Sequence, residues 1–205
     1  MPSVKKPSSL LIASKNLHKI RETKDILKEV LAIDLFTLRD FPTYAPAEES
    51  GGTFEENAIL KATQAATELG MPTLADDSGI VVPALQGKPG IFSSRYAGLE
   101  ATDADNRKKL LLDMEDFLEE DRFAYYHCSI AFSTPDKLQK CSEGKCEGKL
   151  LTQERGGDGF GYDPLFVKHE YSKTFSELKE SIKNRISHRR KALDKILPFL
   201  DAFYS

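Results

Sequence analysis

The sequence contains no tryptophan, only three cysteines and no long hydrophobic run. The cysteines, Cys128, Cys141 and Cys146, form no Cys-x-x-Cys pair and leave one over, which argues against a disulfide scaffold and a structural zinc site. The apolar run "SSLLIAS" is far too short for the core of a signal peptide or for a membrane span. We therefore expect a cytoplasmic protein without a membrane partner, in which residues 1–8 form a flexible leader.

An excess of charge of either sign is also lacking. The 29 Lys and Arg residues nearly balance the 32 Asp and Glu residues, and the net charge of −3 gives no bulk reason to expect nucleic-acid binding. No glycine-rich segment ends in Gly-Lys-Ser/Thr, and none has Rossmann spacing, so neither common nucleotide-binding loop is present. The 205 residues, 40 % of them apolar, suit one sizeable domain or two closely joined lobes.

Hydrophobic periodicity and turn signals predict strands and helices in mixed order. Strands are expected at residues 9–14, on both sides of the pair at 76–77, at 122–134 and, after a turn at "TPDK", at 138–151. Helices are expected near residues 17–31, at 53–70, at 102–119 and, as one or two helices, at the C-terminal end. Thr53 and Glu56 have the spacing of a capping box, and Gly70 is a stop signal. This order indicates a mixed α/β fold around a long central sheet, not a strictly alternating one.

The adjacent aspartates in "MPTLADDSGIVV" are the first candidate site. Asp76 and Asp77 stand where a buried strand is expected to end, and ionised carboxylates are almost never buried unless they are paired or bound to a metal. Asp77 could coordinate Mg²⁺ and activate a water, with Ser78 as a donor to phosphate. Alternatively, Asp-Ser-Gly is a turn in which one aspartate caps the backbone.

Two further segments contain candidate phosphate-binding residues. In "SKNLHK", Ser14, Asn16 and Lys19 lie at a strand-to-helix turn, where unpaired N–H groups attract phosphate. Asn16 could equally be a helix cap and Lys19 a surface residue. Arg95 in "PGIFSSRYAG" could grip phosphate with its planar fork or form a structural ion pair.

An acidic loop precedes the second helix. Glu48 and Glu49 stand before a glycine pair in "AEESGGTFEENAILKA", and adjacent carboxylates in a loop suit an oxygen-preferring cation such as Mg²⁺. The alternative is a solvated acidic loop followed by a capped helix.

Two C-terminal segments could bind a flat ring. The glycines of "GGDGFGYDPLF" let the backbone approach a ligand, Phe160 and Tyr162 could stack on it, and Asp163 could accept its hydrogen bonds. A mobile hairpin is the alternative. In "KNRISHRRKAL", a helix cap at Ser187 would place the next two residues in the first helical turn, where cations are disfavoured unless an anion or an aromatic base is the partner. A basic solvated face is the other interpretation.

Together the segments "SKNLHK", "EESGGTFEENAILKA", "LADDSGIVV", "PGIFSSRYAG", "GFGYDPLF" and "ISHRRKAL" resemble the inosine triphosphate pyrophosphatase family, which acts on non-standard purine nucleoside triphosphates. They occur in the family's order, from about residue 10 to residue 193. The resemblance implies an elongated mixed sheet flanked by helices, with two lobes in one domain over residues 9–205 and a cleft between the lobes. It also implies a homodimer and Mg²⁺-dependent hydrolysis of ITP, dITP and XTP to the monophosphate and pyrophosphate, with no nucleic-acid partner.

The resemblance also assigns residues. It makes Asp77 the general base and a metal ligand, with Glu49 preferred as second ligand and Glu48 retained because the register is ambiguous by one. The substrate-binding positions it implies are Ser14, Lys15, Asn16, Leu17, His18, Lys19, Lys61, Ser78, Arg95, Phe160, Gly161, Tyr162, Asp163, Lys183, His188 and Arg189. Lys15 departs from the family pattern, in which a small residue is common, and we expect it to alter only the charge of the turn.

Other functions remain open from the sequence. One is a Maf-type pyrophosphatase acting on modified pyrimidine nucleotides, although that family lacks "GFGYDP" and "ISHR". Another is a nucleotide- or RNA-binding module without catalysis, in which the acidic cluster would repel phosphates unless a metal bridges them. A plain structural α/β protein would leave the paired aspartates unexplained.

Overall fold

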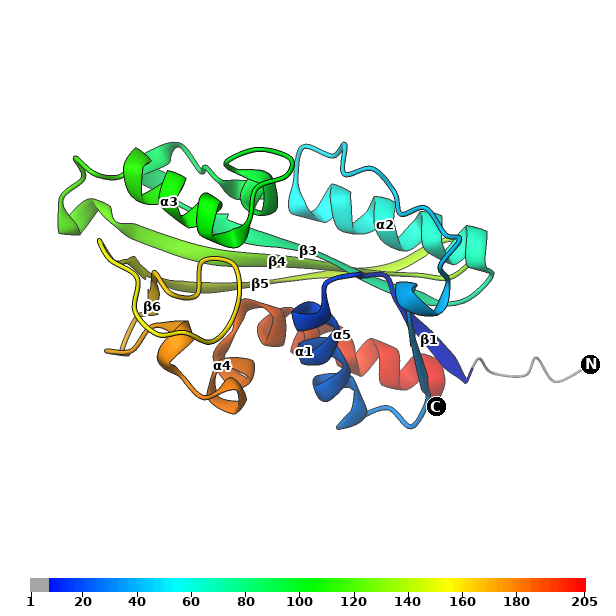
Figure 1. Ribbon diagram of the computed structural model, residues 1–205. Coiled ribbons are helices and arrows are strands. Elements are labelled where there is room, and N and C mark those ends of the chain that lie inside the picture. The colour runs from blue at the N-terminus through cyan, green and yellow to red at the C-terminus, as the bar shows by residue number, and fades with distance from the viewer. Residues whose placement is uncertain (1–7) are drawn as a thin grey trace, which may run out of the picture. The chain divides into compact units, whose positions relative to one another are not determined.

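The strands form one mixed sheet flanked by helices in the computed structural model, which describes residues 8–205 (Figure 1). The strands are β1 (Ser9–Ile12), β2 (Asp34–Thr37), β3 (Thr73–Val81), β4 (Phe123–Ser133), β5 (Leu138–Leu150) and β6 (Phe166–Lys168). The helices are α1 (Leu17–Lys28), α2 (Phe54–Leu69), α3 (Asp103–Asp113), α4 (Glu180–Ile186) and α5 (His188–Tyr204). Within the described residues the strand order is β2-β1-β3-β4-β5-β6. Because β1 is parallel to β2 and β3 while β5 is antiparallel to β6, the predicted mixed α/β fold is confirmed.

The chain divides into two compact units, each assembled from separate stretches of sequence. The first holds the described residues up to 77 together with 129–143 and 191–205, and the second holds 78–128 and 144–190. Of the expected leader, residues 1–7 lie outside the described residues, and the cleft expected between two lobes stays a prediction. None of the helices in the described part of the chain combines the length and apolar character that a membrane span requires.

In the first unit, helix α2 packs on the sheet through a stripe of alanines. Ala58, Ala62 and Ala65 recur at helical spacing on one face and are fully buried. Their small side chains let the helix approach β1 and β3 closely, where Leu11 and Ala75 belong to the same core cluster. Figure 1 shows α2 on one face of these strands and α1 on the other. The polar side chains of α2 are therefore carried by a tightly packed helix.

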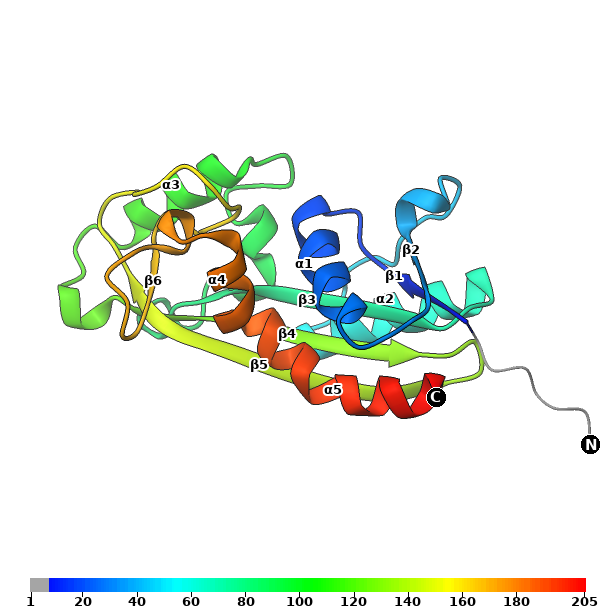
Figure 2. The ribbon, with the colours of Figure 1, turned by 90° about the horizontal axis from the view of Figure 1, so that it is seen from below.

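Helix α5 covers the opposite face of the first unit and runs in front of β4 and β5 in Figure 2. The ring of Phe132 on β4 meets Phe199 and Phe203 edge-on, at 6.0 and 5.1 Å between centroids. The Ser142 hydroxyl on β5 donates to the carbonyl of Ala192 at 2.9 Å. These contacts fix the helix against the strands.

The core of the second unit contains a cluster of aromatic rings. Phe166 meets Tyr126 and Phe175 edge-on at 4.9 and 5.0 Å, and Tyr126 and Phe175 lie parallel at 5.9 Å. Offset and edge-on pairs of this kind stabilise a core beyond the burial of their area. The Tyr126 ring consequently has a fixed position, which matters for the site described below.

Strand β3 corrects one expectation from the sequence. We expected separate strands on the two sides of the Asp pair, with an Asp-Ser-Gly turn as one interpretation of the pair, but one strand runs through Thr73–Val81. Glycine at position 79 serves close packing instead, because a Cβ atom there would lie 2.6 Å from the carbonyl oxygen of Gly90. The Ser93 hydroxyl of that segment accepts the N–H of Ile80 at 2.9 Å. The paired aspartates therefore lie inside a strand and not at its end.

The helix caps agree better with the expectations from the sequence than strand β3 does. The hydroxyl of Thr53 accepts the N–H of Glu56, and Gly70 closes α2 in the left-handed conformation. The Glu56 carboxylate, however, accepts the N–H of Gly52 at 2.7 Å, one residue earlier than a capping box requires. Thr102 caps α3 and the Ser187 hydroxyl accepts the N–H of Arg190 at the start of α5, as predicted.

Two helices are shorter than expected. Helix α1 ends at Lys28 instead of near residue 31, and α3 ends at Asp113 instead of residue 119. Met114 is fully buried after α3, and its carbonyl accepts a hydrogen bond from the buried Arg122 at 2.8 Å. The sequence pattern alone does not reveal this contact between Met114 and a residue beyond the helix.

Candidate active site

Asp76 and Asp77 point to opposite faces of strand β3, because side chains alternate along a strand. The Asp76 carboxylate pairs with the ammonium of Lys19 on α1, at 3.1 Å. The Asp77 carboxylate pairs with the ammonium of Lys61 on α2, at 2.9 Å. Since α1 and α2 lie on opposite faces of the strands (Figure 1), two adjacent negative charges each gain their own lysine.

Asp77 is buried and held at both of its oxygens. It is only 5 % exposed, its Oδ1 contacts Lys61, and its Oδ2 accepts the side-chain amide of Asn57 at 3.1 Å. Burial raises the pKa of the Asp77 carboxyl above its ordinary value, and the charges of Lys61 and Lys19 offset part of that rise. A carboxylate so placed is a candidate general base.

Glu49 shares the lysine of Asp77. The Lys61 ammonium lies 3.1 Å from Glu49 Oε1 and 2.9 Å from Asp77 Oδ1, so the two carboxylates meet at one cation. Burial by itself lowers the pKa of Lys61, but the charges of Asp77, Asp76 and Glu49 together raise it above the usual value. Glu48 is exposed. We call Lys19, Glu49, Lys61, Asp76 and Asp77 the carboxylate cluster; it carries three negative and two positive charges.

The carboxylate cluster offers donors for a metal ion without forming a complete cage. Among residues 8–205, no three His, Cys, Asp or Glu side chains come together in a way that could hold a metal. Mg²⁺ is commonly held by only one or two carboxylates together with waters and substrate phosphates. Glu49 and Asp77 fit that pattern, because their carboxylate oxygens already lie together around the ammonium of Lys61.

The turn before α1 is built as a helix cap. Asn16 Oδ1 accepts the N–H groups of His18 and Lys19 at 3.0 and 3.2 Å, and the Ser14 hydroxyl accepts the N–H of Asn16. The capping interpretation of Asn16 is therefore confirmed, whereas the role of this turn in phosphate binding stays a prediction. The side chains of Lys15, Leu17 and His18 are exposed.

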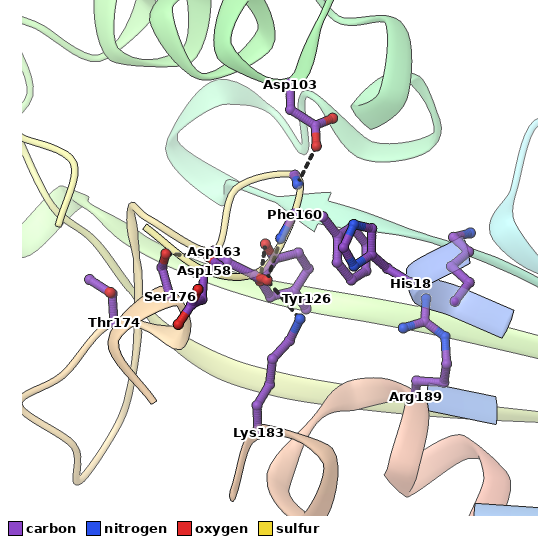
Figure 3. Close-up of polar contacts among 12 residues, drawn as sticks. His18, Asp103, Tyr126, Asp158, Phe160, Asp163, Thr174, Ser176, Lys183 and Arg189 are labelled. Carbon is purple, nitrogen blue, oxygen red and sulfur yellow. Dashed lines mark hydrogen bonds and ion pairs between the residues drawn. The ribbon is translucent and has the colours of Figure 1, made fainter. Parts of the chain in front are cut away.

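In the second unit, Asp163 is the centre of a buried network (Figure 3). Its carboxylate accepts the ammonium of Lys183 at 2.6 Å, the N–H of Phe160 at 3.0 Å and the hydroxyl of Tyr126 at 3.2 Å. The Lys183 ammonium lies 4.3 Å from the centroid of the Phe160 ring. Gly159 has a φ of +84°, and an added Cβ would collide with the Asp163 carboxylate. The network thus fixes an aromatic ring and a cation next to each other.

Tyr162 has a different place from Phe160. It is buried in the core, and its hydroxyl donates to the carbonyl of Ser93 at 2.8 Å. This position favours an anchoring role for Tyr162 and leaves Phe160 as the half-buried ring of the segment. From the sequence of a glycine-rich segment alone, a ring that anchors the segment in the core, such as Tyr162, cannot be distinguished from a ring that faces a ligand, such as Phe160.

The start of α5 brings two buried side chains to the site of the second unit. The His188 ring stacks on Tyr126 at 4.7 Å with an interplanar angle of 9°. The Arg189 guanidinium is 1 % exposed and donates to the Ser78 hydroxyl at 3.0 Å. Ser78 directly follows Asp77 in β3. Arg95, by contrast, lies 5.4 Å from the ring of Phe92, and its role in phosphate binding stays a prediction.

Comparison with known proteins identifies the family of the chain. Residues 10–199 match the model of the Ham1 family. The chain belongs to the Ham1 family. It is 55 % identical to a protein of Protochlamydia amoebophila named dITP/XTP pyrophosphatase, over 94 % of this chain and 97 % of that protein. The solved structure of a HAM1 protein from Coxiella burnetii is 40 % identical with a TM-score of 0.85, and that of the Staphylococcus aureus Ham1 protein is 39 % identical with a TM-score of 0.84. Each alignment covers 95 % of this chain and 98 % of the solved chain.

The resemblance found in the sequence motifs is thus confirmed at the level of the Ham1 family. Two residues of the candidate site were nevertheless missed from the sequence. Asn57 bridges the Asp77 carboxylate and, through its Oδ1, the N–H of Gly51 at 2.8 Å. Its position four residues before Lys61 on the same helical face was the available signal. Tyr126 was read only as part of a strand, and nothing in its local sequence indicates the partners Asp163 and His188.

Proposed function

We propose that this protein hydrolyses the non-standard purine nucleoside triphosphates dITP, XTP and ITP to the monophosphate and pyrophosphate. The observation that carries the proposal is the buried carboxylate of Asp77, held by Lys61 and Asn57 beside Glu49. The dITP/XTP pyrophosphatase named above, which matches nearly the whole chain, supports the choice of substrate. The Maf-type alternative gains no support from these comparisons.

Asp77 is the general base in the reaction that we propose. A water bound at Asp77 gives its proton to the carboxylate while its oxygen forms a bond to the α-phosphorus. The bond from the α-phosphorus to the bridging oxygen breaks, and pyrophosphate leaves with the electron pair. The raised pKa of Asp77 supports this role, because a base whose pKa approaches the working pH accepts a proton more readily.

Glu49 and Asp77 would hold Mg²⁺, which when bound would offset the charge of the triphosphate and of the leaving pyrophosphate. The substrate carries about four negative charges near neutral pH. Lys19 and Lys61 would bind its phosphate oxygens, exchanging their present carboxylate partners in part for phosphate. The surplus negative charge of the carboxylate cluster supports a requirement for a divalent cation.

The residues around Asp163 would receive the base. Phe160 offers a ring for stacking, and Lys183, His188 and Arg189 are buried donors in the second unit. Inosine and xanthine have a keto group at position six, which accepts a hydrogen bond, whereas adenine has an amino donor there. We propose that a buried donor at this position selects against ATP, because an unmatched polar group is costly to bury.

A pyrophosphate-release assay over a panel of triphosphates, with Mg²⁺ and with a chelator, tests the function. We expect dITP, XTP and ITP to exceed ATP by at least about a hundredfold in kcat/KM, with activity lost in chelator. Guanine shares the keto group at position six, so a lower rate with GTP requires that the site excludes its 2-amino group in another way. Equal rates for ITP, ATP and GTP would contradict the proposed specificity. Faster turnover of modified pyrimidine nucleotides would favour a Maf-type activity, and nucleotide binding without pyrophosphate release would favour a binding module.

We also propose that the protein works as a cytoplasmic homodimer. The thiols support a reducing compartment, since none of Cys128, Cys141 and Cys146 forms a disulfide within residues 8–205 and two of them are buried. Light scattering coupled to size-exclusion chromatography would measure the mass, for which twice 22.9 kDa is expected and a monomer would contradict the proposal.

A further inference from the structure

We propose that Asp103 and Arg107 of helix α3 are positioning residues for the loop that receives the nucleobase. This inference deepens the proposed function and rests on it. The loop, residues 154–163, is called the aromatic loop here because it presents Phe160. Neither Asp103 nor Arg107 belongs to the motifs that identify the site in the sequence.

Both side chains hold one residue of the aromatic loop, Gly161. The Asp103 carboxylate accepts the N–H of Gly161 at 2.7 Å, a contact that Figure 3 shows reaching the loop from α3. The Arg107 guanidinium donates to the carbonyl of Gly161 at 2.9 Å. Residues four apart share one face of a helix, so a single turn of α3 can grip both polar groups of Gly161. We call this pair of contacts the Gly161 clamp.

Arg107 also ties the beginning of the loop to its end. Its Nε forms an ion pair with Glu154 Oε1 at 2.9 Å while another nitrogen holds Gly161. The Arg107 side chain is 15 % exposed, which limits screening of these contacts by water. Only the contact with Gly161 is a hydrogen bond, and the contact with Glu154 is an ion pair that arginine can form with a second nitrogen of its planar guanidinium.

The clamp acts on the residue next to Phe160. The N–H of Phe160 is held by Asp163, and its ring lies beside the ammonium of Lys183. Gly161 has a φ of +59°, which a residue with a side chain rarely adopts, so its peptide orientation depends on glycine and on the clamp. The direction of the Phe160 ring is therefore set from two sides, by Asp163 within the loop and by α3 outside it.

A loop that is already ordered binds its ligand without the entropic cost of ordering. Loss of the clamp should consequently weaken nucleotide binding while the chemistry at Asp77 proceeds at its normal rate. A purely structural role of Asp103 or Arg107 in α3 would instead lower stability and leave KM unchanged.

The test compares Asp103→Ala, Asp103→Asn, Arg107→Met and the double variant Asp103→Ala/Arg107→Met, in full-length protein. Lys109→Met is the matched control, because Lys109 is a cation of the same helix paired with Asp113 and has no contact with the loop among the interactions described. We expect KM for ITP to rise about tenfold in Asp103→Ala and Arg107→Met, the factor typical of one lost charge-assisted hydrogen bond, with kcat changed less than about twofold. Asp103→Asn keeps an acceptor oxygen and should fall between Asp103→Ala and the wild type.

The double variant adds a test of joint action. If both residues act through Gly161, its KM should be no more than about twofold above that of the worse single variant, because the effects of groups that share one target are not additive. Hydrogen exchange without nucleotide should accelerate in peptides covering residues 156–163 in the clamp variants and stay unchanged in Lys109→Met.

The possible failures are distinguishable. A wild-type protein that does not hydrolyse ITP overturns the proposed function, and with it the role of the loop in binding a base. Active wild-type protein with an unchanged KM in Asp103→Ala and Arg107→Met overturns the clamp inference alone, as does an increase in KM without faster loop exchange. If Asp103→Ala does not fold, KM for ITP and hydrogen exchange of the loop in Asp103→Asn and Arg107→Met decide whether the clamp inference stands.

Discussion

Asp77 combines burial with two different partners, and this combination makes it a candidate base and not simply a charged residue of a strand. Lys61 keeps a negative charge tolerable in a site that disfavours it, and Asn57 fixes the direction of the second oxygen. Asp76, one residue away, pairs with Lys19 from the other face of the strands. The difference between two neighbouring aspartates is therefore a difference in what surrounds them.

Replacing Asp77 by asparagine should remove the base and preserve the shape. We expect kcat for ITP to fall on the order of a hundredfold to ten-thousandfold, the range attributed to general-base catalysis. Steady-state kinetics and a thermal melt measure the two consequences, and the melting temperature should change little because Lys61 retains Glu49 as a partner.

Asp76→Asn is the matched control for that experiment. The variant loses the other of the two adjacent charges, but we propose that Lys19, the partner of Asp76, acts in binding and not in proton transfer. KM should therefore rise more than kcat falls. Loss of kcat of the same size in both variants would show that the negative charge of the strand, and not the position of Asp77, matters.

The importance of the Asp pair could be predicted from residue types, but its geometry could not. Burying two carboxylates in an apolar run costs free energy, so a functional site or an ion pair is the expected explanation. The break that we expected between two strands at the pair was wrong, and so was the alternative of an Asp-Ser-Gly turn, because Gly79 is required by the approach of a distant segment at Gly90. Contacts between distant segments are not encoded in local propensity.

At the scale of elements, α2 connects packing to catalysis. The alanine stripe on one side of the helix sets its distance from the sheet, and Asn57 and Lys61 on the same helix reach Asp77 at 3.1 and 2.9 Å. A small displacement of the helix would therefore break contacts to the candidate base.

Ala62→Leu should test this connection. Ala62 is fully buried, so the larger side chain should cost about 1–3 kcal/mol of unfolding free energy by overpacking. It should also lower kcat, because α2 would move Lys61 away from Asp77. Thr67→Leu, at an exposed position of the same helix, is the control and should leave both quantities near wild type. Full activity in a destabilised Ala62→Leu variant would contradict the coupling.

Elements with strong local signals were predicted well, and those fixed by tertiary contacts were not. Caps at Thr53, Thr102 and Ser187 have side chains that satisfy the backbone within three residues, so the sequence reveals them. Met114, directly after the early end of α3, is instead buried and accepts a hydrogen bond from Arg122, a contact that has no local signal. The Gly161 clamp likewise joins residues more than fifty positions apart, and no local pattern indicates it.

At the scale of the whole molecule, most candidate residues divide between the two units by their chemistry, except that the phosphate-binding candidates Ser78 and Arg95 belong to the second unit. The first unit contains the carboxylate cluster and the turn before α1, which suit a metal-bound polyphosphate. The second contains the Phe160 ring, the Lys183–Asp163 pair and the buried start of α5, which suit a planar base. The chain as a whole is nearly neutral, so the attraction for a nucleotide must come from these local groups.

The most direct test of the central claim, attack of an Asp77-activated water on the α-phosphorus, is to hydrolyse ITP in water labelled with heavy oxygen. Mass spectrometry of the products shows which phosphorus received the water. We predict one labelled oxygen in the inosine monophosphate and none in the pyrophosphate. Label in the pyrophosphate, or release of inosine diphosphate and phosphate, would contradict the account.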